Sequence, residues 1–206
     1  MTRLLLACGI AGPLLFILVF TLEGAIRPRY RPWRHFVSLL AHGARGWVQA
    51  ANFYVCGALC MCFAVGRWRA EGGAAMPALI AVFGAALIAS GRFRCDAGLG
   101  YPLGAHATWP RTASREGTRH NVAGLIAFVS LAVACFVEAK RADGVWMIYS
   151  LAAGVLVLVL FVVTGVLAER DSRGQVSDPP IGIAQRLAIV IGWSWLAILA
   201  WHSWSS

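Results

Sequence analysis

Six apolar stretches, each close to the length that crosses a bilayer as a helix, constrain this chain more than any other feature. They cover residues 4–22, 47–65, 75–90, 122–139, 145–167 and 183–201. About 20 apolar residues in a helix cross a hydrocarbon core roughly 30 Å thick. The stretches lack the alternation of barrel strands, and lipid satisfies no free backbone groups. The sequence therefore predicts an all-α, polytopic integral membrane protein: a single bundle of six transmembrane helices forming one domain, 1–206.

Composition supports a membrane location and excludes several classes of protein. Hydrophobic residues make up 59% of the chain and charged residues 13%, well below the roughly 25% charged residues of soluble domains. A single Arg3 precedes a long apolar run, so no cleaved signal peptide is predicted. The net charge of +9 is spread over several loops without interleaved aromatic residues. Nucleic acid is therefore not expected as a partner, whereas the lipid bilayer and its anionic headgroups are.

Six spans place the loops after the first, third and fifth helices on one side, which we call the odd-loop face. This face and the flanking helix ends carry 13 of the 18 basic residues: Arg27, Arg29, Arg31, Arg34, Arg45, Arg92, Arg94, Arg111, Arg115, Arg119, Arg170, Arg173 and Arg186. Four of the five histidines lie there too: His35, His42, His106 and His120. Any site is expected at this face. The basic count favours a cytoplasmic odd-loop face in a bacterial inner membrane, although arginines that bind an anion would inflate the count and leave orientation open.

The loop after the first span has the pattern of an amphipathic helix over residues 32–42. At 100° per residue its polar side chains fall within about 100° of arc: Arg31, Arg34, His35, Ser38 and His42. Pro32 suits the first turn of a helix and Gly43 the position just after its end. The segment is expected to lie in the membrane interface, either as a simple anchor or as one wall of a site in which a histidine contacts the Ser38 hydroxyl.

A second polar cluster lies in the long connection 91–121. Asp96 follows the third span, and His120 opens the fourth, where Thr118 is the expected N-cap. Neutral imidazole at a helix start can act as a base or, together with Asp96, bind a metal such as zinc, with His106, His35 or His42 as the third ligand. The alternative is structural, with Asp96 paired to a nearby arginine. Haem is not predicted, because the histidines do not face one another within the spans.

Polar residues also enter the spans from this face. Glu23 is the expected partner of Arg186, either as structural glue or as the floor of a headgroup pocket. Arg34, Arg45, Arg94 and Arg119 are the residues expected to hold an anionic headgroup beside that pair.

Four segments of the sequence resemble the DUF998 family, six-span bacterial membrane proteins without an assigned function. They are residues 23–59 (EGAIRPRYRPWRHFVSLL and onward), 91–104 (GRFRCDAGLGYPLG), 118–128 (TRHNVAGLIAF) and 184–200 (AQRLAIVIGWSWLAILA). The resemblance implies the six-span fold and singles out Ser38, Asp96 and His120. The sequence departs from the family pattern at Arg94 with Cys95, and at Asn121, where an acid is frequent.

The sequence is compatible with two classes of function, one enzymatic and one non-catalytic. The first is a membrane-embedded hydrolase or transferase, metal-dependent or not, that acts on an amphiphilic substrate with an anionic headgroup. In it Ser38, Asp96 and His120 are the catalytic candidates. The second is a non-catalytic protein that binds or transports a lipid or small solute, or an accessory subunit of a membrane complex.

Overall fold

The computed structural model describes residues 1–205, and six long α-helices account for most of them. The elements in chain order are α1 (Thr2–Ile26), the short 3₁₀ helix η1 (Val37–Ala41), α2 (Gly46–Glu71), α3 (Ala75–Arg92), α4 (Arg115–Ala139), α5 (Gly144–Ser172) and α6 (Ile181–Ser205). All six α-helices are long and apolar enough to cross a membrane. Over the described residues the only β-type pairing is an isolated bridge. The predicted all-α, six-span fold is confirmed, which indicates a multi-pass membrane protein.

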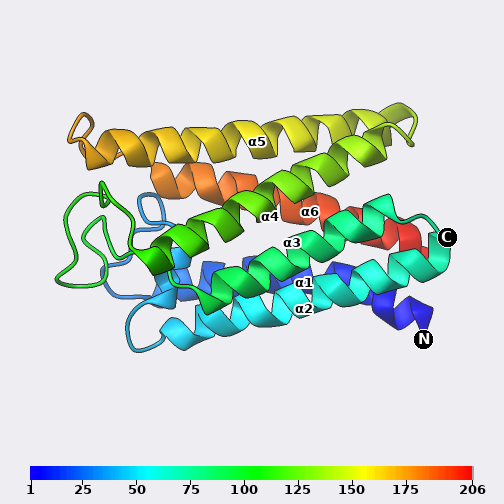
Figure 1. Cartoon of the computed structure of the whole chain (residues 1–206), viewed down its shortest axis with the longest axis horizontal. Coiled ribbons are helices and arrows are strands. Elements are labelled where there is room, and N and C mark those ends of the chain that lie inside the picture. Colours follow the sequence, from blue (N-terminus) through cyan, green and yellow to red (C-terminus); the bar gives the residue numbers. More distant parts are fainter. Residues whose placement is uncertain (206) are drawn as a thin grey trace.

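The helices run lengthwise and form a ring in chain order (Figure 1). Each packs mainly against its two neighbours in sequence, and α6 closes the ring against α1. The N-terminus and the end of α6 lie at one end of the bundle. The three connections 27–45, 93–114 and 173–180 lie together at the other end, which is the odd-loop face.

An aromatic cluster around Trp193 of α6 fills the middle of the ring. Its indole lies 5.4 Å from the Phe16 ring of α1, 4.8 Å from Phe83 of α3 and 5.9 Å from Phe128 of α4, measured between ring centroids. Aromatic pairs at such separations add to the stabilisation from buried area. One side chain thus joins four helices.

The predicted interfacial helix over 32–42 is wrong. Residues 32–35 form a turn closed by the bond from the His35 N–H to the Arg31 carbonyl (2.8 Å), and only η1 follows. Every residue of η1 is buried, because the segment tucks between α1, α2 and α6. The Gln185 side chain of α6 accepts a hydrogen bond from the Val37 N–H (2.7 Å). The backbone of this segment therefore bonds to groups from other parts of the chain, instead of forming the local α-helical hydrogen bonds that the amphipathic pattern predicted.

The fourth helix also begins earlier than predicted. Its N-cap is Ser114, whose hydroxyl accepts a hydrogen bond from the Gly117 N–H (2.9 Å), rather than Thr118. The apolar run begins only at Val122, which is why hydropathy missed the first two turns. His120 consequently lies in the second turn of α4, where the interior of the bundle begins.

Candidate functional site

Glu23 is the centre of a buried ion-pair cluster at the end of α1. Its carboxylate accepts hydrogen bonds from Arg27 Nε (2.8 Å) and from the Arg45 guanidinium, one of them from Nε at 3.3 Å. Arg27 also donates to the Leu40 carbonyl (3.1 Å) and to the Tyr101 hydroxyl (3.2 Å). The hydrogen bonds to Glu23 raise the pKa of Arg45. This cluster ties two loops to α1.

Arg186 does not pair with Glu23, which corrects the partner expected from the sequence. Its guanidinium donates to the His35 carbonyl (2.9 Å), to the Pro32 carbonyl and to the Tyr30 hydroxyl. Burial raises the pKa of Tyr30 to about 12, so this hydroxyl stays neutral. Arg186 therefore holds the turn before η1 in place.

Arg34 is buried in a second ion-pair cluster. It donates to the Asp178 carboxylate and, at 3.3 Å, to Asp171, and it donates to the Ala107 carbonyl at 2.9 Å. Asp171 also accepts a bond from the Trp109 N–H at 2.7 Å. The cluster fastens the loop 93–114 to the end of α5.

The remaining expected anion-binding residues lie outside the bundle. Arg94 and Arg119 are exposed, and the Arg119 guanidinium lies over the Phe93 ring at 5.3 Å. His106 is exposed as well and lines a cavity that His120 does not line.

Asp96 serves the start of α4. Its Oδ2 accepts a hydrogen bond from the Ser114 N–H (3.0 Å), and its carboxylate occupies the space that a side chain on Gly117 would need. A carboxylate at this position complements the positive end of the helix dipole. Asp96 therefore lies beside His120 in the fold but reaches the backbone at the helix start.

His120 is fixed by backbone carbonyls. Its Nδ1 lies 2.8 Å from the Phe93 oxygen and 3.2 Å from the Ser90 oxygen. Because carbonyls only accept hydrogen bonds, Nδ1 carries the proton and Nε2 of the neutral ring keeps its lone pair. This nitrogen is the one available for a ligand or a proton.

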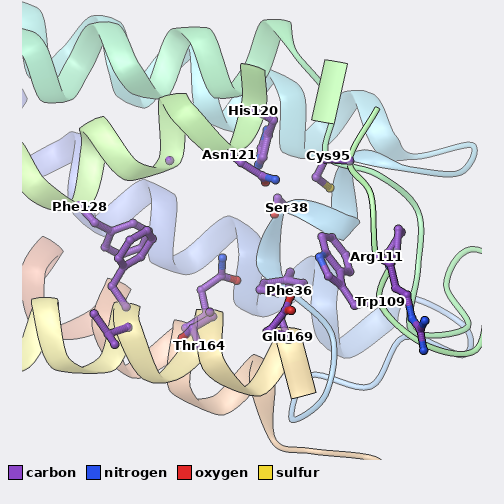
Figure 2. Close-up of a pocket in the computed structure, with 18 residues that line it drawn as sticks. Phe36, Ser38, Cys95, Trp109, Arg111, His120, Asn121, Phe128, Thr164 and Glu169 are labelled. Carbon is purple, nitrogen blue, oxygen red and sulfur yellow. The ribbon is translucent and has the colours of Figure 1, made fainter. Parts of the chain in front are cut away.

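A cavity of about 410 Å³ lies beside His120, between α4, α5 and the loop 93–114 (Figure 2). We call it the outer cavity. Figure 2 shows His120, Asn121, Cys95 and Ser38 gathered at one end, with Phe128 and Thr164 at the other. Its volume falls in the range of pockets that bind small ligands. Two residues of the predicted catalytic set, Ser38 and His120, thus share one cavity, and Asp96 is not among the residues that line it.

The outer cavity changes from polar to apolar with depth. On α4 its lining runs from His120 to Phe128, and on α5 from Glu169 to Phe161. Each run covers nine residues, which is about 12 Å along a helix. The only charged lining residues are Arg111 and Glu169, one of each sign, near the loops. The cavity is therefore amphipathic and balanced in charge.

The outer cavity is open between α4 and α5. A Cβ added to Gly124 of α4 or Gly165 of α5 would meet no atom within 4 Å, and both glycines line the cavity. Val162, another lining residue, is 60% exposed on the apolar outside of the bundle. The two helices also diverge towards the odd-loop face in Figure 1. The opening thus faces the side of the bundle that lipid would cover.

Cys95 lines the polar end of the outer cavity and contacts His42. His42 Nε2 donates to the Cys95 carbonyl (2.8 Å) and lies 3.7 Å from the thiol sulfur. Burial raises the pKa of the Cys95 thiol to about 12, which a hydrogen bond with Ser38 only partly offsets. Burial also lowers the pKa of His42. Both side chains are therefore neutral, and the thiol is not an activated nucleophile.

The expected metal ligands do not form a cluster. Among the side chains that the structure describes, no group of three or more His, Cys, Asp or Glu is arranged to hold a metal ion.

Several residues that line the outer cavity were not predicted from the sequence as site residues. They are Phe36, Trp109, Arg111, Asn121, Phe128, Thr164, Glu169 and Gln185. Thr164 is the only hydroxyl residue in the second half of the apolar run of the fifth span, which was a usable signal. Gly124 of α4 and Gly165 of α5 gave no such signal in the sequence, because their role depends on which helix lies opposite.

Comparison with known proteins gives a family and no further relative. The family model described as "Protein of unknown function (DUF998)" matches residues 10–202. No curated protein and no solved structure matches the chain.

Proposed function

This chain belongs to the DUF998 family, whose members have no assigned function, and we propose from the outer cavity that it binds a single-chain amphiphile taken from the bilayer. The observation that carries the proposal is the lateral opening at Gly124 and Gly165. It leads from the outside of the bundle into an apolar cleft that has a polar end. An acyl chain would lie between α4 and α5, near Phe128 and Val162, with its head towards the loops.

The charges at the cavity indicate which head group it would accept. Arg34, Arg45, Arg94 and Arg119 do not line the outer cavity, and the charged residues that do are Arg111 and Glu169. Arg111 Nε already donates to the Ser172 carbonyl (3.0 Å), and Glu169 pairs with Arg173 (2.7 Å). An uncharged or zwitterionic head therefore fits this lining better than the anionic head expected from the sequence.

A single substitution tests the binding proposal. Gly165→Leu would place a side chain in the cleft, and leucine is a better helix former than glycine, so the helix is retained. We expect equilibrium binding of a radiolabelled medium-chain monoacylglycerol to the purified protein to weaken at least about tenfold, because the cleft is filled.

The matched control is Ala152→Leu, which places the same leucine side chain on the exposed side of α5 away from the cavity. It is expected to bind like the wild type. Unchanged binding in Gly165→Leu, or no binding by the wild type, would contradict the proposal.

A second candidate function, acyl hydrolysis or transfer, is favoured by one observation. Ser38 and His120 line the same cavity, and the protonation of His120 Nδ1 leaves Nε2 able to accept a proton. Ser38 Oγ would attack the acyl carbonyl and give its proton to Nε2. The ester bond would then break, with that proton passing to the leaving alcohol, and water would release the acid from the acylated serine.

This candidate is tested by measuring fatty acid released from the monoacylglycerol. Ser38→Ala and His120→Gln are expected to abolish release while binding persists. An absence of release by the wild type, with binding intact, leaves the non-catalytic function.

A further inference from the structure

A smaller cavity of about 50 Å³ lies behind the outer cavity, towards the middle of the bundle. We call it the inner chamber. Five of its lining residues also line the outer cavity: Ser38, His120, Gly124, Phe128 and Gln185. The inner chamber therefore adjoins the outer cavity at these residues, and a ligand in the cleft would lie next to it.

One residue that lines the inner chamber carries a hydrogen-bond donor without a partner. Trp193 lines it and is 2% exposed, yet its Nε1 has no hydrogen-bond partner among the described residues. The neighbouring buried indole of Trp195 does have one, because its Nε1 donates to Ser150 Oγ at 3.0 Å. A buried N–H left unpaired costs roughly 1–3 kcal/mol, so native structures rarely keep one without a use.

The other lining groups indicate the chemistry of the missing partner. The Gln185 side-chain oxygen is occupied by the Val37 N–H, which leaves its amide hydrogens as donors. The Ser90 hydroxyl donates to the Ala86 carbonyl (2.9 Å). Apart from His120, no ionisable side chain lines the inner chamber. The chamber thus offers N–H donors without a compensating charge, which suits an uncharged acceptor oxygen.

Size and position narrow the acceptor further. A water occupies about 30 Å³ of liquid volume, so the inner chamber has room for one small polar group and not for a head group. Gly124, which lines both cavities, lies between the polar Asn121 and the apolar Phe128 on α4. In a ligand that lies along the cleft, the group at this level joins the head to the chain.

We propose that the inner chamber receives the acyl carbonyl oxygen at the head-to-chain junction of the bound amphiphile, with the Trp193 indole N–H as its donor. This rests on the proposed binding function. It assigns the ligand class as acyl esters or amides in preference to alkyl ethers or free hydrocarbon chains.

The test compares two probes that differ at one group, a monoacylglycerol and the monoalkyl glycerol ether of equal chain length. The wild type is expected to bind the ester about fivefold more tightly, which is the contribution of one hydrogen bond between neutral groups. Trp193→Phe keeps an aromatic ring and removes the N–H, so it should bind the two probes equally. The matched control Trp195→Phe should keep the preference, because Trp195 does not line the inner chamber.

Equal binding of ester and ether by the wild type, or an ester preference that survives Trp193→Phe, would overturn this inference. If Gly165→Leu still weakens binding of both probes at least about tenfold, the binding function stands although the carbonyl subsite fails. Binding of neither probe by the wild type overturns both.

A second measurement does not depend on the folding of Trp193→Phe. The carbonyl stretch of an isotope-labelled monoacylglycerol should move to lower frequency on binding to the wild type than in detergent alone, since the carbonyl then accepts a buried hydrogen bond. A frequency typical of a carbonyl without a hydrogen bond would overturn the subsite.

Discussion

The two polar regions of the odd-loop face differ in how far their groups satisfy one another. The arginine clusters around Glu23 and Asp171 are closed, with each carboxylate bound by at least one buried guanidinium, although the Nε of Arg34 is left without a partner in the described part of the chain. The outer cavity, built from neighbouring parts of the same loops, has open space and few charges, and Trp193, which lines the inner chamber, has an unpaired indole N–H. Dense charge is thus found where ion pairs hold the loops to the helices, whereas the candidate site combines open space with few charges.

The strongest way to break the comparison is to open a closed cluster. Asp171→Ala would leave Arg34 buried with a reduced set of partners and would strip the Trp109 N–H of its acceptor. Removing one partner of a buried pair typically costs about 3–5 kcal/mol. We expect a large fall in the melting temperature of the detergent-purified protein.

The control for this prediction is Asp178→Ala, at the other carboxylate of Arg34. The Asp178 side chain is 43% exposed, so this substitution should lower the free energy of unfolding by less than about 1 kcal/mol. Equal melting temperatures for the two variants would contradict the closed cluster.

Acid should weaken the same loops through His35. Burial lowers its pKa to about 4, and the ring is neutral with Nδ1 accepting from the Arg31 N–H (2.9 Å) and Nε2 donating to the Leu99 carbonyl (3.0 Å). The unfolded chain binds a proton at this ring below pH about 6.5, whereas the folded chain does so only below about 4. Stability should therefore fall by roughly 3 kcal/mol as pH decreases through that window.

Melting temperatures at several pH values within that window check this prediction. His35→Gln should flatten the dependence, since the glutamine does not titrate, and the exposed His106→Gln should leave it as in the wild type. A steep acid loss that persists in His35→Gln would assign it elsewhere, for example to His42, whose pKa burial also lowers.

A smaller effect separates the two readings of Asp96. Asp96→Asn keeps an acceptor for the Ser114 N–H and loses the charge at the start of α4. If Asp96 acts only at the helix end, this substitution should lower the free energy of unfolding by about 1 kcal/mol or less. Binding of the monoacylglycerol should be unchanged. A loss of bound zinc from the purified protein on this substitution would instead support the metal-dependent reading.

The smallest effect is expected at the arginines outside the bundle. Arg119→Ala removes an exposed side chain, so both stability and monoacylglycerol binding should change little, within about 0.5 kcal/mol. Thermal melting and equilibrium binding measure both quantities. A tenfold loss of binding would instead place the binding site at the exposed arginines that were predicted from the sequence.

Local patterns predicted much of this molecule. The length and hydropathy of the six spans led to the fold, since a chain in lipid must satisfy its backbone within helices. Span counting also placed Ser38, Asp96 and His120 at one end of the bundle. Pairing between side chains was less predictable: Glu23 was assigned to Arg186, and it binds Arg27 and Arg45. Opposite charges at one face have many possible partners, and packing selects among them.

The sequence alone determined the six helices, the odd-loop face and the residue types gathered there, because these follow from composition and from the period along one segment. Only the tertiary structure decided that residues 32–42 are buried rather than interfacial, and that Ser38 and His120 share a cavity while Asp96 serves the backbone. It also decided that Gly124 and Gly165 face open space and that Trp193 lacks a partner. These properties belong to groups from different helices brought within a few ångströms, and no single stretch of sequence encodes which groups meet.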